Sequence, residues 1–543
     1  MKKNLLFICA LLAATGVSLV TTSCKDADDV QDITLGQVLS PTSLKMTANA
    51  DISITVSWNE MFNADSYELV VSQDESFTDA TKEVYNQTIA QAYVKGSSCS
   101  VKLPKLDPET TYYGRLKAIS SKGVAGSKYV FANVITVSEQ IMNPIQKADI
   151  TDKSVAISWT AGEVVKEIQV LNADGDVVKT IVPTDTEIQN GKKTIDGLTA
   201  HTTYTIRLVS TTDKTRGRRT FTTLLDLSNA TVITAAQGAD GSWQAIIEGA
   251  AAGTTFALEP GDYTSNGTLK ITNNVVIAAK DITKMPILHT QISIDNNASL
   301  YCYYIALTAD DNKVFEDQCF VFKSNGATGS LDVEGCEIYN YKKGLVYVAN
   351  NVNTIINEIN ITESYIHDIV CNGGDFLDTR AGYWTTLNFK NNTVVNSFAN
   401  RAFVRVDVGA AITNVENNTF YKCGSDENGD SYGIFTNKDA GAVSNFNNNI
   451  VEGYVQKRGF NGGRATATVK AANNVYFNCL NLVELDPNNT SSNKPTFLDD
   501  KGQVLTASPF VDAKNGDFRL TDPNLRLKQV GAAYWYGQDV PEE

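Results

Sequence analysis

Charged and apolar side chains alternate in short stretches of the second half of the chain, and the clearest is RAFVRVD at 401–407. In a β-strand, successive side chains point to opposite faces, so Val404 and Val406 would face one side and Arg405 and Asp407 the other. Similar stretches are FVFKS, LVYVA, FLDTR, IFTNK, VQKR and VELD, which begin at 320, 345, 376, 434, 455 and 483. Strands of this kind, placed side by side, would form one polar surface.

Aligning these stretches on their inward apolar residues predicts two outward columns. The first column is Phe322, Tyr347, Asp378, Arg405, Thr436, Gln456 and Glu484. The second column is Ser324, Ala349, Arg380, Asp407, Lys438, Arg458 and Asp486. Stacked strands lie about 4.8 Å apart, so the charged residues of the middle strands would share a patch on the order of 10 Å across.

Three cations in this patch could act on a uronic acid sugar by β-elimination. That reaction requires neutralising the C6 carboxylate, removing the C5 proton and stabilising the leaving oxygen. Arg and Lys neutralise carboxylates, and a basic group crowded by cations has a lowered pKa, more readily for Lys than for Arg. The candidate catalytic residues are Arg380, Arg405 and Lys438. The candidate substrate-binding residues are Tyr347, Asp378, Asp407 and Arg458.

Other interpretations of the patch stay open. Alternating acids and bases form cross-strand ion pairs that only stabilise a solvated sheet, and the same groups could bind a glycan without chemistry. Asp378 and Asp407 could hold Ca²⁺, although the columns contain fewer acids than a tight calcium site needs.

Two kinds of catalysis are disfavoured. Hydrolysis by paired aspartates is the weakest enzyme hypothesis, because no DD or DxD occurs in these strands and Asp310 and Asp311 precede them. Histidine catalysis is also disfavoured, because the chain has only three histidines.

A repeat must position the charged strands. The segments LDVEGCEIYN, INITESYIHD, LNFKNNTVVN, TNVENNTFYK, SNFNNNIVEG and VKAANNVYFN share one pattern. Their anchor residues are Cys336, Ser364, Asn392, Asn418, Asn449 and Asn474, at steps of 28, 28, 26, 31 and 25 residues. Such units cannot bury an apolar face alone and must stack, and an Asn in each turn can bond to the Asn of the next coil.

The repeat resembles the right-handed parallel β-helix of the pectate lyase superfamily, which has an asparagine ladder. The entry segment strengthens the resemblance, because a short helix would precede the phrase GTTFALEPGDY at 253–263. The resemblance covers about 226–490, and 491–543 is similar to the closing segment of such domains. It implies that the charged strands line a polysaccharide cleft, with an acidic glycan such as pectin or alginate as partner. Another solenoid or a sandwich is the alternative.

Two short all-β domains come before the repeat. Period-two alternation begins near residue 36, and Trp58 and the phrase LDPETTY at 106–112 resemble a fibronectin type III domain with a buried corner tyrosine, Tyr112. A second copy contains Trp159 and Tyr204. We assign these domains to 36–138 and 142–224 and expect them to act as spacers, although exposed aromatic residues on one face would favour binding.

The first 24 residues have a basic start, an apolar run and the ending TTSC, which resembles a bacterial lipobox. The resemblance implies acylation at Cys24, and the acidic linker at 25–35 resembles the export signal of Bacteroidetes surface lipoproteins. We therefore expect a lipid-anchored protein at the outer membrane surface, with a plain secreted protein as the alternative.

Charge and cysteine content limit the possible partners. The chain of 543 residues has 46 basic and 61 acidic residues, a formal charge of -15, which opposes general binding to nucleic acid. No CxxC pair occurs among the nine cysteines, so a zinc or redox site has little support and we expect mostly small buried side chains. The sequence thus predicts an all-β protein of two sandwiches and a parallel β-helix.

Overall fold

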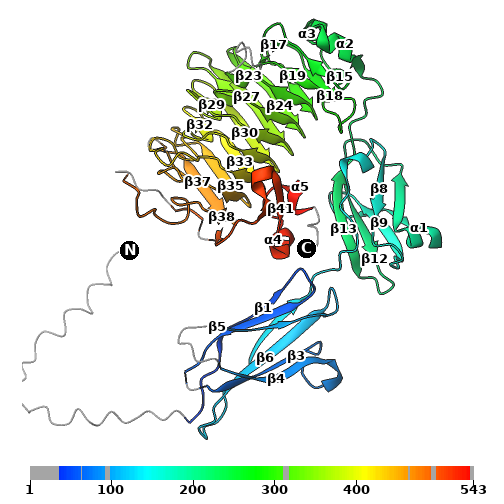
Figure 1. Cartoon of the computed structure of the whole chain (residues 1–543), viewed down its shortest axis with the longest axis vertical. Coiled ribbons are helices and arrows are strands. Elements are labelled where there is room, and N and C mark those ends of the chain that lie inside the picture. Colours follow the sequence, from blue (N-terminus) through cyan, green and yellow to red (C-terminus); the bar gives the residue numbers. More distant parts are fainter. Residues whose placement is uncertain are drawn as a thin grey trace, which may run out of the picture. The chain divides into compact units, whose positions relative to one another are not determined.

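The computed structural model describes residues 36–62, 64–91, 98–309, 317–462, 465–490, 497–499 and 501–537. Most of the first sandwich, including residues 55–102 and 111–134, belongs to one compact unit, and the second sandwich and the long repeat belong to another. Within the described residues, no helix is long and apolar enough to cross a membrane. Figure 1 shows that strands dominate all three parts of the chain.

The first sandwich has a three-stranded and a four-stranded sheet. The three-stranded sheet contains β1 (Thr42–Ala48), β2 (Ile54–Asn59) and β5 (Ser98–Leu103). The four-stranded sheet contains β4 (Glu83–Ala90), β3 (Ser66–Ser72), β6 (Thr111–Ile119) and β7 (Val130–Ile135), in that order. Trp58 and the predicted corner residue Tyr112 are both buried, which confirms their core positions.

The second sandwich repeats this plan with fewer residues. Its larger sheet contains β10 (Val177–Ile181), β9 (Glu167–Leu171), β12 (Thr203–Val209) and β13 (Thr215–Thr222). Its smaller sheet contains β11 (Lys192–Asp196) and β8 (Ser154–Ser158), and α1 (Asp185–Asn190) precedes β11. Tyr204 is buried and its hydroxyl accepts a hydrogen bond from the Thr199 amide at 3.2 Å, as expected of a tyrosine corner.

The long repeat is a parallel β-helix built from three sheets, as predicted. Sheet A contains β17 (Leu269–Ile271), β20 (Ile292–Ile294), β23 (Gln318–Phe322), β26 (Gly344–Val348), β29 (Leu377–Thr379) and β32 (Val404–Val406). Sheet B contains β14 (Thr231–Ile233), β15 (Thr254–Leu258), β18 (Val275–Ala279), β21 (Leu300–Tyr303), β24 (Gly326–Glu334), β27 (Thr354–Thr362), β30 (Tyr383–Lys390), β33 (Ile412–Glu416), β35 (Val443–Asn447) and β37 (Thr468–Ala472).

Sheet C completes each coil. It contains β16 (Asp262–Tyr263), β19 (Ile287–His289), β22 (Ala306–Thr308), β25 (Glu337–Tyr339), β28 (Tyr365–His367), β31 (Thr393–Val395), β34 (Thr419–Tyr421), β36 (Ile450–Glu452), β38 (Val475–Phe477) and β39 (Gln503–Val504). The chain passes from sheet A to B to C and back, and all neighbouring strands are parallel, which fits a right-handed coil. In Figure 1 the strands of successive coils stack along the domain.

The predicted asparagine ladder lies in the turn between sheets B and C. Asn392, Asn418 and Asn449 are fully buried, and each Nδ2 donates to the Oδ1 of the next ladder residue at 3.0–3.2 Å. The residue before each ladder Asn has a left-handed backbone, with φ of 58° at Asn391 and 55° at Asn417. Asn tolerates this conformation better than other side chains, so the Asn-Asn pairs suit the turn.

Additional segments close the core at its ends and on one side. The short helices α2 (Ala235–Ala239) and α3 (Ser242–Glu248) cap the first coil, and Trp243 is buried there. The C-terminal segment contains β40 (Phe510–Asp512), β41 (Asp517–Leu520), α4 (Pro523–Lys528) and α5 (Ala533–Tyr536). Its Phe518 and Leu520 pack in one cluster with Tyr421 and Ile450, which lie on the outer side of sheet C.

The cysteines fill the interior of the β-helix. Six of the seven described cysteines are buried and none is in a disulfide. They are Cys302, Cys319, Cys336, Cys371, Cys423 and Cys479. Burial raises the pKa of the Cys336, Cys423 and Cys479 thiols to about 12, so they stay protonated and serve as small core side chains, as predicted.

Candidate functional site

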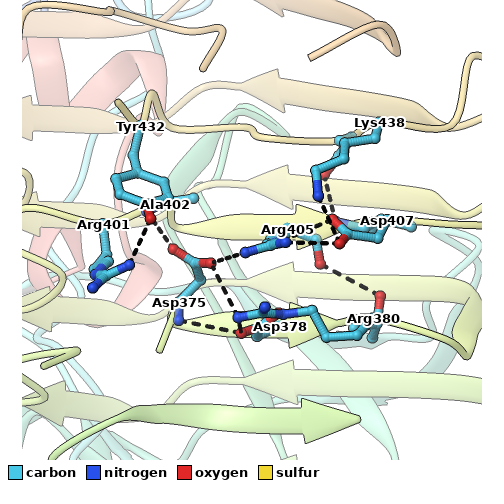
Figure 2. Close-up of polar contacts among 12 residues, drawn as sticks. Asp375, Asp378, Arg380, Arg401, Ala402, Arg405, Asp407, Tyr432 and Lys438 are labelled. Atoms are coloured by element: carbon cyan, nitrogen blue, oxygen red, sulfur yellow. Dashed lines mark hydrogen bonds and ion pairs between the residues drawn. The ribbon is translucent and has the colours of Figure 1, made fainter. Parts of the chain in front are cut away.

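The charged stretches of the middle coils lie on sheet A. Asp378 pairs with Arg405 in neighbouring strands β29 and β32, and Val404 pairs with Phe435 of the next coil. The apolar neighbours Val404 and Val406 are fully buried, so the side chains between them point outward. Figure 2 shows the resulting outward cluster, in which the arginine side chains extend along the strands.

Asp407 joins two cations of neighbouring coils. Its two carboxylate oxygens accept from Nε and Nη2 of Arg405, both at 2.7 Å. The ammonium of Lys438 also donates to Oδ2 of Asp407 at 2.7 Å. A two-pronged guanidinium–carboxylate pair fixes orientation as well as charge, so Arg405 and Lys438 are held in defined positions.

A second pair lies one coil earlier, above a carboxylate that the sequence did not single out. Arg380 bonds both oxygens of Asp378, with Nη2 to Oδ2 at 2.5 Å. Asp375 lies between the two arginines, with Oδ2 at 3.4 Å from Arg405 Nη1 and 3.8 Å from Arg380 Nη2. The other oxygen of Asp375 accepts from the amide of Ala402 at 3.1 Å. Asp375 therefore links the two pairs into one cluster of six charges (Figure 2).

The six charged groups differ in burial. Asp375 and Asp378 are buried, with side-chain exposures of 0% and 1%, whereas Asp407 at 17% is about as exposed as its partner Arg405 at 14%. Arg380 and Lys438 are the most exposed, at 21% and 27%. The cluster is neutral in sum, yet the groups that meet solvent are mainly donors of hydrogen bonds.

The electrostatics keep the arginines protonated. Burial lowers the pKa of Arg405, but its hydrogen bonds to Asp407 and the negative charges of Asp407, Asp378 and Asp375 outweigh it and raise the pKa. The pKa of Arg380 is raised in the same way, with Asp378 as its partner. Burial raises the pKa of Asp407, yet its bonds to Arg405 and Lys438 bring it below the usual value. A general base must lose its proton, so this arrangement opposes a basic role for either arginine.

Asp375 differs from the other acids in its environment. Burial and the nearby charge of Asp378 raise its pKa, and the Ala402 amide and the two arginines only partly compensate. Its carboxylate lies within 3.4 Å of Arg405 Nη1 and 3.8 Å of Arg380 Nη2. Here it fixes the inner sides of Arg380 and Arg405.

The predicted columns are wrong at both ends. Val321, not Phe322, pairs with Tyr347, so Phe322 lies in the core and Ser324 does not share the column of outward residues. This stretch has apolar residues on both faces, and its pattern does not define the register. Tyr347 is placed as predicted, beside Asp378, and is partly exposed.

Arg458 does not continue the second column. Phe435 pairs with Asn461, so VQKR lies in the loop before the strand position. Gln456 is buried and donates to loop carbonyls, and Arg458 forms an ion pair with Asp430 at 3.1 Å. VELD also lies outside any strand, since Glu484 and Asp486 are in a turn around Asn481. The substrate-binding role of Arg458 stays a prediction, but the register that suggested it is wrong.

The donor set of the cluster does not fit Ca²⁺. Both oxygens of Asp378 are bonded to Arg380, and both oxygens of Asp407 are bonded to Arg405. Calcium takes six to eight oxygen ligands, and here it would have to displace guanidinium groups. Within the described ranges, no group of three or more His, Cys, Asp or Glu side chains is placed to hold a metal ion. Calcium at Asp378 and Asp407 stays a prediction.

Two neighbours of the cluster that the alignment missed stand close to the aligned stretches. Asp375 stands three residues before Asp378 in GGDFLD, just outside the aligned stretch. Arg401 is the first residue of RAFVRVD, and it donates to the Tyr432 hydroxyl at 2.6 Å with its guanidinium over the tyrosine ring. Beside the cluster, Thr436 Oγ1 and Asn461 Oδ1 are buried, and neither finds a hydrogen-bond partner among the residues that the structure describes. Cys24, Asp310 and Asp311 lie outside the described residues.

Two known protein families match parts of the chain. The fibronectin type III family matches residues 39–132, so this segment is a fibronectin type III domain. A domain of unknown function, DUF4957, matches residues 261–397, which include β29 of the cluster. No curated protein matches the chain.

Two similar solved structures consist of fibronectin-type domains. A segment of two fibronectin type III domains from chicken tenascin is 16% identical over 34% of this chain and 98% of its own, with a TM-score of 0.22. The FN1–FN3 domains of chicken CNTN1 are 14% identical over 34% of this chain and 65% of their own, with a TM-score of 0.16.

Proposed function

We propose that the protein binds an acidic polysaccharide on the outer side of sheet A, through Arg380, Arg405 and Lys438. The ion pairs of these cations with Asp378 and Asp407 carry the proposal. They hold the cations in place before any ligand arrives, which lowers the entropic cost of binding. The cations still have unused N–H donors, because Lys438 uses one of three in its bond to Asp407.

A uronate polymer suits this surface better than a neutral one. Its carboxylates can bond to the outer donors, and its hydroxyl groups can bond to both acids and bases of the cluster. The strands of sheet A repeat about every 4.8 Å, so a glycan lying across the coils would pass Arg380, Arg405 and Lys438 at steps of about that length. Pectin-like and alginate-like polymers have this chemistry.

The protein would act at the cell surface. The leader and Cys24 support acylation and export to the outer membrane, by their resemblance to lipoprotein signals. The β-helix and the charged sheet support a relation to the pectate lyase superfamily. In this proposal, the sandwiches connect the lipid anchor to the glycan-binding domain.

Affinity electrophoresis in gels that contain polygalacturonate or alginate tests the proposal. Lys438→Gln and Arg405→Gln should each abolish most of the retardation that the unmodified protein shows. Lys390→Gln is a matched control, because Lys390 is also paired with an acid, Glu416 at 3.0 Å, but lies on sheet B. Equal retardation of the three variants and the unmodified protein would exclude binding at this surface.

Cleavage of the same polymer by β-elimination is a second candidate function. One observation favours it: Lys438 has the most exposed side chain of the cluster and sits beside Arg405, which could neutralise a uronate. Lys438 would then have to release a proton to Asp407 or solvent before removing the C5 proton. Absorbance from unsaturated uronide product, measured with the unmodified protein, separates cleavage from binding.

A further inference from the structure

The four-stranded sheet of the first sandwich carries a cluster of rings around one arginine. The Arg115 guanidinium on β6 lies 4.7 Å from the centre of the Phe77 ring and 5.0 Å from that of Tyr129. Phe131 on β7 completes the cluster, with its ring 6.2 Å from Phe77 and 6.4 Å from Tyr129. We call these four residues the ring cluster.

Arg115 has contacts with rings but lacks hydrogen-bond acceptors. Its Nε is buried without a partner, and among the described residues its guanidinium makes no hydrogen bond. The nearby acid Glu68 is already engaged by Lys117 at 2.9 Å and by the Tyr129 hydroxyl. A guanidinium has five N–H donors, and a folded protein rarely leaves them all without an acceptor. The structure thus presents donors that a ligand could satisfy.

The rings themselves are not arranged as an ordinary core. Phe131 is 65% exposed, although a phenyl ring on a sandwich is normally covered. Phe77 adopts a φ of 54°, a left-handed backbone that is a genuine outlier for a bulky residue and recurs at ligand clamps. The exposed ring of Phe131 and the strained backbone of Phe77 both lie next to a cation with unsatisfied donors, and together they point to a binding surface.

We propose that the ring cluster is a second binding site, for a single uronate residue of the same polysaccharide. A uronate offers both kinds of group that the cluster needs. Its carboxylate is the preferred two-pronged acceptor for the Arg115 guanidinium, and the C–H side of its ring can pack on the exposed ring of Phe131. The first sandwich then serves as a binding domain and not only as a spacer.

This inference takes its ligand class from the proposed function, but it rests on separate residues. The test uses the whole protein and isothermal titration with an oligogalacturonate and, as controls, a neutral glucan oligomer and an acidic peptide. Phe131→Ala and Arg115→Gln should each remove one class of uronate site or weaken it at least tenfold. Ile135→Ala is the matched control, because Ile135 is also on β7, is 61% exposed and is not part of the ring cluster.

The outcomes separate the two sites. In one outcome, Phe131→Ala and Arg115→Gln bind the oligogalacturonate as well as Ile135→Ala does, whereas Arg405→Gln loses binding. The ring cluster is then not a glycan site, and the sheet A proposal stands. Loss of binding only in Phe131→Ala and Arg115→Gln supports the ring cluster and overturns sheet A. Equal binding of the neutral oligomer, or binding of the acidic peptide alone, overturns the uronate assignment. Circular dichroism of Phe131→Ala checks that the fold is retained.

Discussion

Replacing Asn418 by alanine should destabilise the β-helix more than any comparable change on its surface. The Asn418 side chain makes four hydrogen bonds inside the turn between β33 and β34. Its Nδ2 donates to Phe389 O at 2.9 Å and to Asn449 Oδ1 at 3.0 Å. Its Oδ1 accepts from the amide and the side chain of Asn392, at 2.9 and 3.2 Å. No water can replace these bonds readily, because the residue is fully buried.

The expected cost follows from these contacts. A buried hydrogen bond contributes about 1 kcal/mol net, so Asn418→Ala should lower the free energy of unfolding by about 4 kcal/mol. Asn414→Ala is a control from the same coil. The Asn414 side chain forms a similar ladder with Asn388 and Asn445, at 2.9 and 2.8 Å, but on the partly exposed outer side of sheet B. Water can substitute there, so we expect a cost below about 1 kcal/mol.

Differential scanning calorimetry of the two variants provides the comparison. With about 2 °C per kcal/mol for a large domain, Asn418→Ala should lower the Tm of the β-helix transition by about 8 °C and Asn414→Ala by about 2 °C or less. Equal Tm shifts in the two variants would refute the reasoning, because the buried hydrogen bonds of the inner ladder would then contribute no more stability than the partly exposed ones.

Three further predictions concern charge, metal and export. Burial lowers the pKa of His367, but its bonds to Glu337 and Asp368 outweigh burial and raise the pKa. The protonated imidazole therefore stabilises the fold at pH values below its unfolded pKa of about 6.5, and this stabilisation is lost as pH rises through the raised folded pKa. The Tm should therefore fall more for the unmodified protein than for His367→Gln between about pH 6 and about pH 8, and parallel curves would contradict this. Removal of divalent ions with EDTA should leave glycan retardation unchanged, whereas its loss, with recovery on adding Ca²⁺, would restore the calcium hypothesis. Cys24→Ala should release the protein from membranes in a fractionation assay, and a variant that stays membrane-bound would exclude the lipid anchor.

The ladder could be predicted because local and long-range requirements coincide in it. Asn at 391 suits a left-handed turn, and Asn at 392 can bond to the same position of the next coil. Both requirements appear directly as an Asn-Asn pair at each step of the repeat. The apolar pattern of FVRVD likewise determined its register, since only one face could be buried without burying charge.

The errors arose where one of these requirements was missing. FVFKS offers two apolar faces, so nothing in it prevents a shift by one residue. VQKR lies within the connection from Glu452 to Asn461, the residue that pairs with Phe435, and not at the strand position. The length of such a connection has no periodic signal in the sequence. Asp375 lies in such a connecting segment, and its role depends on Arg405, thirty residues later. Contacts of this kind appear only when the coils are stacked.

The ring cluster also could not be predicted from the sequence pattern. Phe131 alternates correctly for an outward strand position, but its approach to Phe77 joins two segments that are far apart in the chain. The sequence could suggest only that exposed aromatic residues on a sandwich would favour binding over a spacer role.

A crystal structure of the protein with an oligogalacturonate tests the central claim most directly. We predict electron density for the sugar on the outer side of sheet A, with a uronate carboxylate within hydrogen-bond distance of Lys438 Nζ or the Arg405 guanidinium. Asp375, Asp378 and Asp407 should keep their arginine partners in the complex. A saturated crystal with this surface free of sugar, and with the six charged groups unchanged, would contradict the proposal and leave the cluster a set of structural ion pairs.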